Sequence, residues 1–379
     1  MHDCDSNTGC GNRWGARRGR AAIGVSLFFA LLFAQLAQIA PAGEEYSSSG
    51  NYQLGRGYRI PALGVSLGGY ASVKHVDLEA RQPFTEISDL SLFLGWDNGA
   101  RWRAFSELEI GEALVYRDGE LTSDESEFEL ERAYVDYLHA DWLTLRLGKA
   151  LAPIGHWNSI HADPLIWTVS RPLTTDAGFS HYISGLSLLG SIPGERGVWE
   201  YQAYVDNSAR LDPRPDNRSP TGEVIPGLEI GPFDHAVGAR LVYQPDSESW
   251  QFGLSLARFG IEDFAGVKHL LGLDFQWHLA GVSLSGEALY RSDSNEDAGE
   301  VGGVFLQAVA PITFAPRWYF VSRAERFRDE TVSARVDTLS LGLAWRPLPP
   351  VVFKLEGRQG RGNETLAPDG VFSSLAILF

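Results

Sequence analysis

The stretch Val371-Phe372-Ser373-Ser374-Leu375-Ala376-Ile377-Leu378-Phe379 decides the fold of this 379-residue chain. Its side chains alternate with period two, and one face carries Val371, Leu375, Ile377 and Phe379. Exposed chain ends normally fray, so an apolar strand that ends in an aromatic residue is unusual in a soluble domain. The stretch therefore predicts a strand with an apolar face that is paired into a sheet.

The same alternation recurs along the chain. Leu90, Leu92, Leu94 and Trp96 share one strand face, for example, and Asp89, Ser91, Phe93 and Gly95 share the other. A period of two predicts strands rather than helices. We count sixteen such segments, centred near residues 70, 91, 106, 134, 146, 187, 202, 240, 254, 273, 287, 306, 323, 340, 355 and 375.

The connections between these segments alternate between short and long. The short ones are rich in Gly, Pro, Asn and Asp, as tight turns require: 97–99, 139–141, 191–197, 245–249, 279–281, 311–317 and 346–350. The longer polar loops include 111–127, 150–182, 207–235, 292–300 and 359–370. This pattern predicts an all-β fold, a transmembrane antiparallel up-and-down β-barrel of about sixteen strands. A soluble sandwich or propeller is the alternative.

Tryptophan supports the barrel, because indole prefers the interface between a membrane and water. Eight tryptophans lie beside the seven short turns: Trp96, Trp102, Trp142, Trp199, Trp250, Trp277, Trp318 and Trp345. They predict an aromatic girdle at the end of the barrel that holds the short turns.

Two stretches resemble known families. The strand that ends at Phe379 resembles the C-terminal strand by which Gram-negative outer-membrane barrels are recognised by the barrel-assembly machinery. This resemblance implies an outer-membrane location and places the short turns on the periplasmic side. Leu145-Arg146-Leu147-Gly148-Lys149, followed by Pro153-Ile154-Gly155 and Asn158, resembles the signature of porins related to the phosphate-selective O/P type. That resemblance implies a pore, and at the family level a homotrimer.

Residues 1–42 are typical of a secretory signal peptide for the Sec pathway. Arg13, Arg17, Arg18 and Arg20 precede an apolar stretch, and Ala40-Pro41-Ala42 offers a small-residue cleavage site. An N-terminal membrane anchor is the alternative. We expect residues 43–63 to form an N-terminal periplasmic lead-in and residues 64–379 to form the barrel.

Composition excludes several functions. The formal net charge of −16 leaves no basic surface for nucleic acid. Both cysteines, Cys4 and Cys10, lie in the expected signal peptide, so cysteine-based redox and metal sites are excluded. No catalytic constellation stands out, and we expect neither an enzyme nor a cofactor.

Charged residues on the faces opposite the apolar ones must line the lumen, because a charge facing lipid costs about 2–4 kcal/mol. Such a lumen is either a water-filled channel or closed by salt bridges, and sixteen strands favour the channel. Loop 150–182 is expected to fold inward and narrow it. We predict that Asp163 and Asp176 of this loop oppose an arginine cluster from Arg101, Arg103, Arg132 and Arg146, and that Glu107 also lines the pore. Solvated loop acids are the alternative.

The predicted function is an outer-membrane porin for passive diffusion of small hydrophilic solutes or ions. Its weak ion selectivity is expected to lean towards cations, because loops 119–131 and 293–300 are acidic. The alternatives are a phosphate- or anion-selective porin, and a non-conducting structural or enzymatic barrel. His156, His161, Asp163 and His181 share one loop and include metal-binding residue types, but ordinary loop histidines are the favoured interpretation.

Overall fold

The computed structural model describes residues 51–379 except 80, 125, 161, 212–230 and 296–298. The expected signal peptide lies outside the described residues. Sixteen long strands form the wall: β3 (Val65–Leu78), β4 (Phe84–Asp97), β5 (Trp102–Arg117), β7 (Glu127–Ala140), β8 (Leu143–Leu151), β9 (Tyr182–Pro193), β10 (Gly197–Asp206), β11 (Phe233–Pro245), β12 (Trp250–Ile261), β13 (Lys268–Leu279), β14 (Val282–Asp293), β15 (Val301–Pro311), β16 (Trp318–Asp329), β17 (Ala334–Leu348), β18 (Val351–Gly362) and β19 (Gly370–Leu378).

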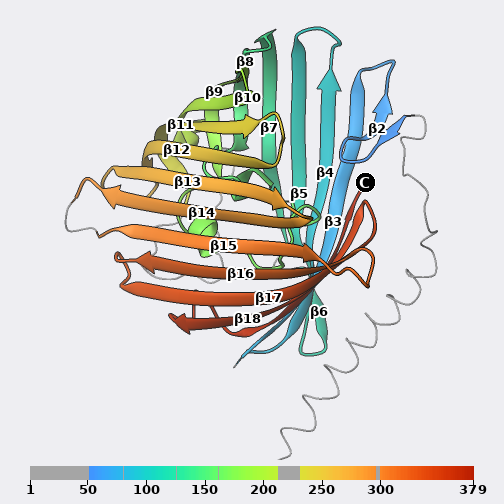
Figure 1. The fold of residues 1–379 in the computed structure, drawn as a ribbon, viewed down its shortest axis with the longest axis vertical. Helices are drawn as coiled ribbons and strands as arrows, with labels where there is room; N and C mark the ends of the chain where they lie inside the picture. The colour runs from blue at the N-terminus through green and yellow to red at the C-terminus, as the bar shows by residue number, and fades with distance from the viewer. Residues whose placement is uncertain (1–50, 80, 125, 161, 212–230, 296–298) are drawn as a thin grey trace, which may run out of the picture. The chain divides into compact units, whose positions relative to one another are not determined.

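These strands close into one antiparallel barrel (Figure 1). Each long strand pairs with the next along the chain, and β19 pairs with β3 from Gly370↔Leu78 to Leu378↔Tyr70. Every predicted strand centre falls within an observed strand. The predicted fold class is therefore confirmed, and the alternation of side chains was sufficient to find each strand.

The described short turns share one end of the barrel, here named the turn end. Phe379 lies at this end, because its N–H donates to the carbonyl of Gly69, and the Leu378 N–H donates to Pro350 in the β17–β18 turn. The opposite, loop end is less uniform than the sequence predicted. Residues 330–333 alone join β16 to β17 there, whereas residues 312–317 join β15 to β16 at the turn end. Ser333 adopts a positive φ of 54°, so a tight turn suffices between these strands.

The outer face of the wall is apolar. Leu92 and Leu94 of β4, for example, are 47% and 46% exposed. At the turn end, tryptophans of adjacent strands are directly paired and lie side by side, as in Trp250↔Trp277 and Trp318↔Trp345. An apolar band edged by indole rings is the surface that a lipid bilayer requires. Among the residues that the structure describes, no helix is long and apolar enough to cross a membrane.

Part of the expected lead-in is a small hairpin of β1 (Tyr52–Gln53) and β2 (Gly57–Ile60). β2 pairs with β3 from Tyr58↔Leu67 to Ile60↔Val65. The β19–β3 pairing stops at Tyr70, so β2 continues the wall on the turn-end side of that point. A further short strand, β6 (Glu120–Thr122), pairs with the loop end of β5, and α3 (Ser208–Leu211) follows β10.

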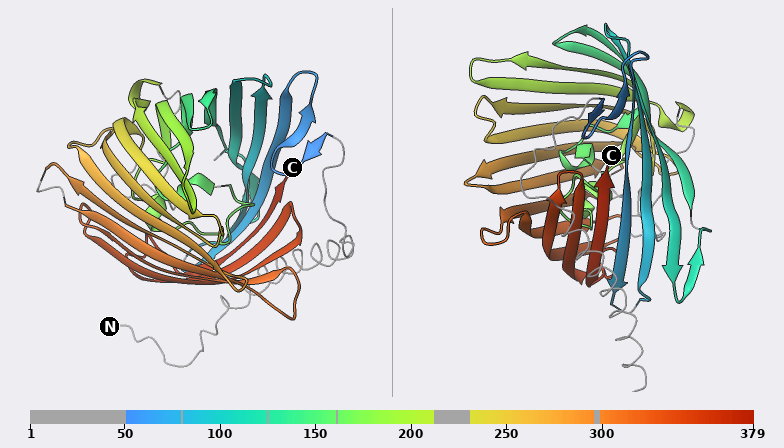
Figure 2. Two further views of the ribbon diagram at one scale, coloured as in Figure 1. Left: turned by 45° about the horizontal axis from the view of Figure 1, so that its top comes forward. Right: turned by 90° about the vertical axis from the view of Figure 1, so that its right-hand side faces the viewer.

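The segment between β8 and β9 folds into the barrel, as predicted (Figure 2, left). It contains the 3₁₀ turn η1 (Trp157–Ile160) and the short helix α2 (Leu173–Asp176). Here it is named the inner loop. Its apolar side chains pack on lumen-facing residues of the wall: Trp157 meets Phe305 edge-on with ring centroids 5.9 Å apart, and Leu173 joins a buried cluster with Phe327. Ile154 and Phe179 of the inner loop also pack in a buried cluster with residues of β8 to β14, so apolar packing holds the loop on both sides of the lumen.

Candidate functional site

Three glutamates of the wall hold the backbone of the inner loop. Glu325 of β16 accepts hydrogen bonds from the N–H and hydroxyl of Thr174, at 2.7 and 2.8 Å. Glu356 of β18 accepts the N–H groups of Val169 and Ser170, at 2.8 and 3.0 Å. Glu287 of β14 accepts the N–H of Trp157 at 2.5 Å. Buried N–H groups need hydrogen-bond acceptors, and these carboxylates supply the acceptors that the carbonyls of a neighbouring strand would otherwise supply.

Basic side chains of the same wall bind the inner loop's oxygen atoms. Lys354 of β18 donates to the carbonyl and the carboxylate of Asp163, at 2.9 and 3.1 Å. Arg323 of β16 donates to the Ser170 carbonyl at 2.9 Å, and Arg346 of β17 to that of Pro164 at 3.1 Å. These six charged residues of β14, β16, β17 and β18 thus point inward, as predicted, but they bind the loop and do not line open water.

One open part of the lumen lies against the opposite wall. A cavity of about 460 Å³, the arginine cavity, is bounded by the inner loop at Pro153 and Gly155 and by strands β7 to β11. Three arginines line it, namely Arg132 of β7, Arg146 of β8 and Arg240 of β11, and so do two exposed acids, Asp141 and Glu200. No large hydrophobic side chain of the loop lines it, so it has room for water and solutes.

Each of the three arginines is paired with a carboxylate that is less exposed. Arg146 makes two hydrogen bonds to Asp136, at 2.8 and 2.9 Å, Arg240 bonds Asp274 at 2.7 Å, and Arg132 bonds Glu107. The arginine side chains are 20%, 14% and 20% exposed, against 13%, 0% and 0% for Asp136, Asp274 and Glu107. Guanidinium groups therefore face the cavity and the acids lie behind them.

Aromatic rings set the orientation of two of these arginines. The Arg146 guanidinium lies 3.8 Å from the ring centroid of Tyr134, and that of Arg132 lies 4.8 Å from Phe105. Stacking on a ring holds a guanidinium in place while its charge stays available to the solvent.

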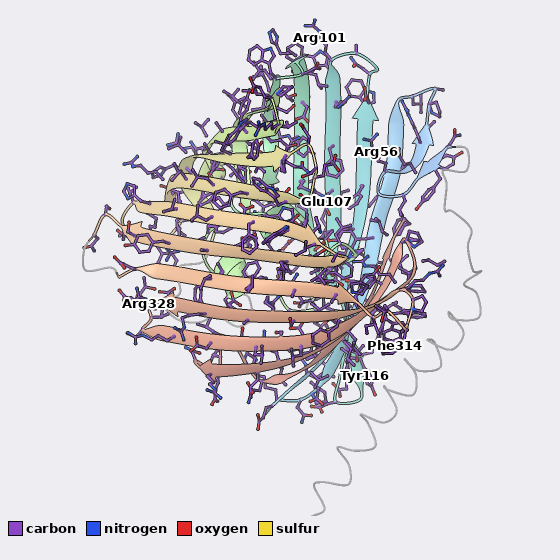
Figure 3. The ribbon with its side chains drawn as sticks, in the orientation of Figure 1. Arg56, Arg101, Glu107, Tyr116, Phe314 and Arg328 are labelled. Atoms are coloured by element: carbon purple, nitrogen blue, oxygen red, sulfur yellow. The ribbon has the colours of Figure 1, made fainter. Side chains whose placement is uncertain are left out.

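The structure brings together only some of the predicted site residues. Arg132, Arg146 and Glu107 lie on the wall of the arginine cavity or directly behind it. Arg103 bonds Asp97 at 3.0 Å near the turn end, and Arg101 bonds the Tyr137 hydroxyl at 3.1 Å. Figure 3 shows Arg101 at the tip of β5, well away from Glu107. The arginines are thus spread along the wall rather than gathered in one cluster.

The two loop acids do not oppose these arginines. Asp163 is 4% exposed and pairs with Lys354, while Asp176 is 9% exposed and lies 3.5 Å from His181. A carboxylate that is buried by loop packing must take a nearby cation, and for Asp163 this cation comes from β18. The expected transverse arrangement, with loop acids facing wall arginines, is therefore not what the described side chains form.

The loop histidines also take separate partners. The ring of His156 lies 3.2 Å from the side-chain amide of Gln251, and burial together with the nearby Arg240 lowers the pKa of His156 from 6.5 to about 4. His161 lies outside the described residues. Among the described residues, no group of three or more His, Cys, Asp or Glu is placed to hold a metal ion.

Sequence reasoning missed the pair Arg240 and Asp274 as part of the site. Both have lumen parity, but β11 and β13 are not adjacent, and their contact crosses β12 at Gly253. A Cβ on Gly253 would meet the Asp274 carboxylate at 2.2 Å, so the missing side chain makes the contact possible. A lumen-facing glycine between two charged strands was the available signal.

Comparison with known proteins supports the same architecture. No family model matches the chain. An uncharacterized protein of Aquifex aeolicus (strain VF5) is 29% identical over 284 residues, which are 72% of this chain; the match spans only 57% of that relative.

Solved structures with a similar fold include an anion-selective porin from Comamonas acidovorans, with 13% identity over 83% of this chain and 98% of the porin, at a TM-score of 0.55. The outer-membrane channel DcaP of Acinetobacter baumannii is 11% identical, and the match covers 86% of this chain and 100% of the channel at a TM-score of 0.55. OmpF of Salmonella typhi in complex with daunomycin is 11% identical, and the match covers 84% of this chain and 99% of OmpF at a TM-score of 0.55. At these identities the likeness shows a shared porin-like barrel fold.

Proposed function

We propose that this chain is an outer-membrane porin that lets small hydrophilic solutes diffuse passively through a water-filled lumen. The observation that carries this proposal is the uneven filling of a closed sixteen-strand barrel. Hydrogen bonds hold the inner loop on β14–β18 and apolar contacts hold it on β8–β14, yet the arginine cavity stays open beside β7–β11. A barrel built only for strength or adhesion has no need of a polar cavity that its inner loop leaves open.

The proposed selectivity favours anions, which reverses the expectation drawn from the acidic loops. Three guanidinium groups face the arginine cavity with their paired carboxylates behind them, and they outnumber the two other acids of its lining, Asp141 and Glu200. In a narrow lumen with low-dielectric walls, the nearest charges dominate the potential. The negative loops at the barrel mouth are farther from this point and are screened by salt over about 8–10 Å.

Phosphate selectivity is not part of the proposal. It would require a cluster of basic residues, and each lysine of this chain instead contacts a partner of its own. Lys74 pairs with Asp89, Lys268 with Asp293 and Lys354 with Asp163. Lys149 lies over the ring of Tyr182 with its Nζ 4.9 Å from the ring centroid.

The remaining parts of the proposal rest on the resemblances. They are export through the Sec pathway, insertion by the barrel-assembly machinery through the strand ending at Phe379, outer-membrane lipid as the surrounding medium, and a homotrimer. The apolar outer face and its tryptophans support the membrane location.

A planar lipid bilayer tests the porin proposal. The purified, refolded chain is expected to produce stepwise increases in current in KCl, and to migrate differently on detergent gels before and after boiling. Protein that shows the folded, heat-modifiable band but passes no current would refute the pore and favour a structural barrel.

A further inference from the structure

A second cavity, of about 760 Å³, lies at the turn end between the β1–β2 hairpin and strands β3, β4, β5 and β7. It is named here the hairpin cavity. Arg56 and Arg59 of the hairpin line it, together with Arg103 and the rings of Phe93, Phe105 and Tyr134. Figure 3 shows Arg56 beside the turn-end half of β3. Tyr134 also lines the arginine cavity, so the two cavities adjoin.

Register explains why this cavity exists. Arg59 pairs with Ser66, Ser66 with Gly95, Gly95 with Phe105, and Phe105 with Tyr134, so these residues form one row across five strands. Directly paired residues share a face of the sheet, and Tyr134 faces the lumen. The two small residues in the middle leave a gap, with a cation on one side and two rings on the other.

The aromatic side of the gap is a continuous surface. Ring centroids are 5.7 Å apart for Phe93 and Phe105, and 5.5 Å apart for Phe105 and Tyr134. All three side chains are only partly buried. Arginine guanidinium groups lie against Phe105 and Tyr134, so the rings are held in fixed orientations. A partly exposed row of rings in a polar lumen offers a planar ligand a surface for stacking.

The cationic side carries two guanidinium groups of the hairpin, those of Arg56 and Arg59. The side chains of Arg56 and Arg59 have no hydrogen bond or ion pair with any described residue, and both residues are exposed. Arg103, by contrast, is bound to Asp97 at 3.0 Å. Arg59 also acts electrostatically on Asp97, which lines the same cavity. Guanidinium groups without hydrogen bonds to the described residues, on a hairpin that is paired with β3, can bind a further carboxylate.

We propose that the hairpin cavity binds aromatic carboxylates. The carboxylate would bond to Arg56 and Arg59, and the ring would stack on Phe93 and Phe105. An inorganic anion would use only the arginines, and a neutral sugar only the rings, so neither uses the whole surface. The proposal does not depend on conduction, because a lumen site can bind a ligand in a barrel that passes no current.

The test measures binding of 4-fluorobenzoate to the full chain in detergent micelles, by fluorine NMR line broadening. Saturable binding to the unaltered protein is expected. The variant R56Q/R59Q should bind about tenfold more weakly, which corresponds to about 1.4 kcal/mol. A matched control, R210Q/R328Q, removes the same charge at exposed sites outside the cavity and should bind like the unaltered protein. Equal binding by R56Q/R59Q and the control would overturn the proposal.

Two further probes separate the ring from the charge. The saturated acid 4-fluorocyclohexanecarboxylate and the neutral 4-fluorobenzyl alcohol should both bind more weakly than 4-fluorobenzoate. Phe105→Leu, checked for folding by its heat-modifiable band, should remove the preference for the aromatic acid over the saturated one. Equal binding of either probe, or an unchanged preference in Phe105→Leu, would contradict the proposed mode. Because these measurements need no current, they separate this site from the porin proposal.

Discussion

At the scale of single residues, the site is shaped by which member of each ion pair is exposed. Arg146 and Asp136 carry opposite charges, yet the arginine stands nearer the water because it stacks on Tyr134 while the acid sits against the strand. The sequence shows only that both residues belong on the lumen face. Burial depth depends on side-chain length and on the neighbouring ring, so the sign of the exposed surface could not be read from counts of acids and bases.

Removing one such pair should change selectivity without changing net charge. In the double variant D136N/R146Q, we expect weaker anion preference, because the exposed guanidinium disappears while the lost carboxylate was partly shielded. The measurement is the reversal potential across a KCl gradient. The matched control is R326Q/D337N, a bidentate pair with bonds of 2.6 and 3.3 Å that lies exposed. If the control and D136N/R146Q shift the reversal potential equally, the Arg146–Asp136 pair does not set the selectivity.

His156 predicts a dependence of stability on pH. Its pKa is lowered from 6.5 to about 4 in the folded barrel, so between these values the unfolded chain binds a proton that the folded chain does not. Stability from this residue is therefore complete above pH 6.5 and is lost as the pH falls towards 4. Between pH 7 and 4.5 the free energy of unfolding should fall by about 2–3 kcal/mol, because each pH unit in this range contributes up to about 1.36 kcal/mol.

The check is urea unfolding of the refolded protein at both pH values. His156→Gln, which keeps a polar side chain beside Gln251, should lose this part of the pH dependence. The same change in unfolding free energy in both proteins would assign the dependence to other groups.

At the scale of elements, the strands could be predicted from the sequence and the inner loop's contacts could not. Strands such as β4 and β13 show their alternation within a dozen residues, because lipid and water lie on opposite faces. The inner loop was predicted to fold inward, but Ser170 meets Glu356 across 186 positions of sequence. Such partners follow from the closure of the barrel and from strand register, and no local pattern encodes them.

The anchoring of the inner loop gives an element-scale prediction. In Glu356→Gln the amide oxygen can still accept the two backbone N–H groups, but the negative charge beside Arg323 and the acceptor of the Ser170 hydroxyl are lost, which should cost roughly 1–3 kcal/mol of unfolding free energy. The freed loop should also raise the noise of the open-channel current. Glu330→Gln, at an exposed ion pair with Arg328, is the control and should change stability by less than about 0.5 kcal/mol. A quiet, fully stable E356Q channel would show that Glu356 does not hold the loop.

At the scale of the whole molecule, the barrel divides its lumen between support and passage. On the wall from β14 to β18, charged side chains such as Arg323 and Lys354 bind the inner loop. On the wall from β7 to β11, arginines line the open cavity. A chain with a net charge of −16 therefore places three guanidinium groups beside two exposed acids, Asp141 and Glu200, along this cavity. Net charge describes the molecule's solubility and long-range field, whereas selectivity depends on the few groups beside the path.

The reversal potential of the unaltered protein in a planar bilayer, under a KCl gradient, tests this account most directly. Stepwise conductance with a reversal potential of the sign set by chloride is the predicted result, and the preference should weaken as the salt concentration rises because screening increases. A membrane that stays silent with folded protein, or a reversal potential of the sign set by potassium, would contradict the account.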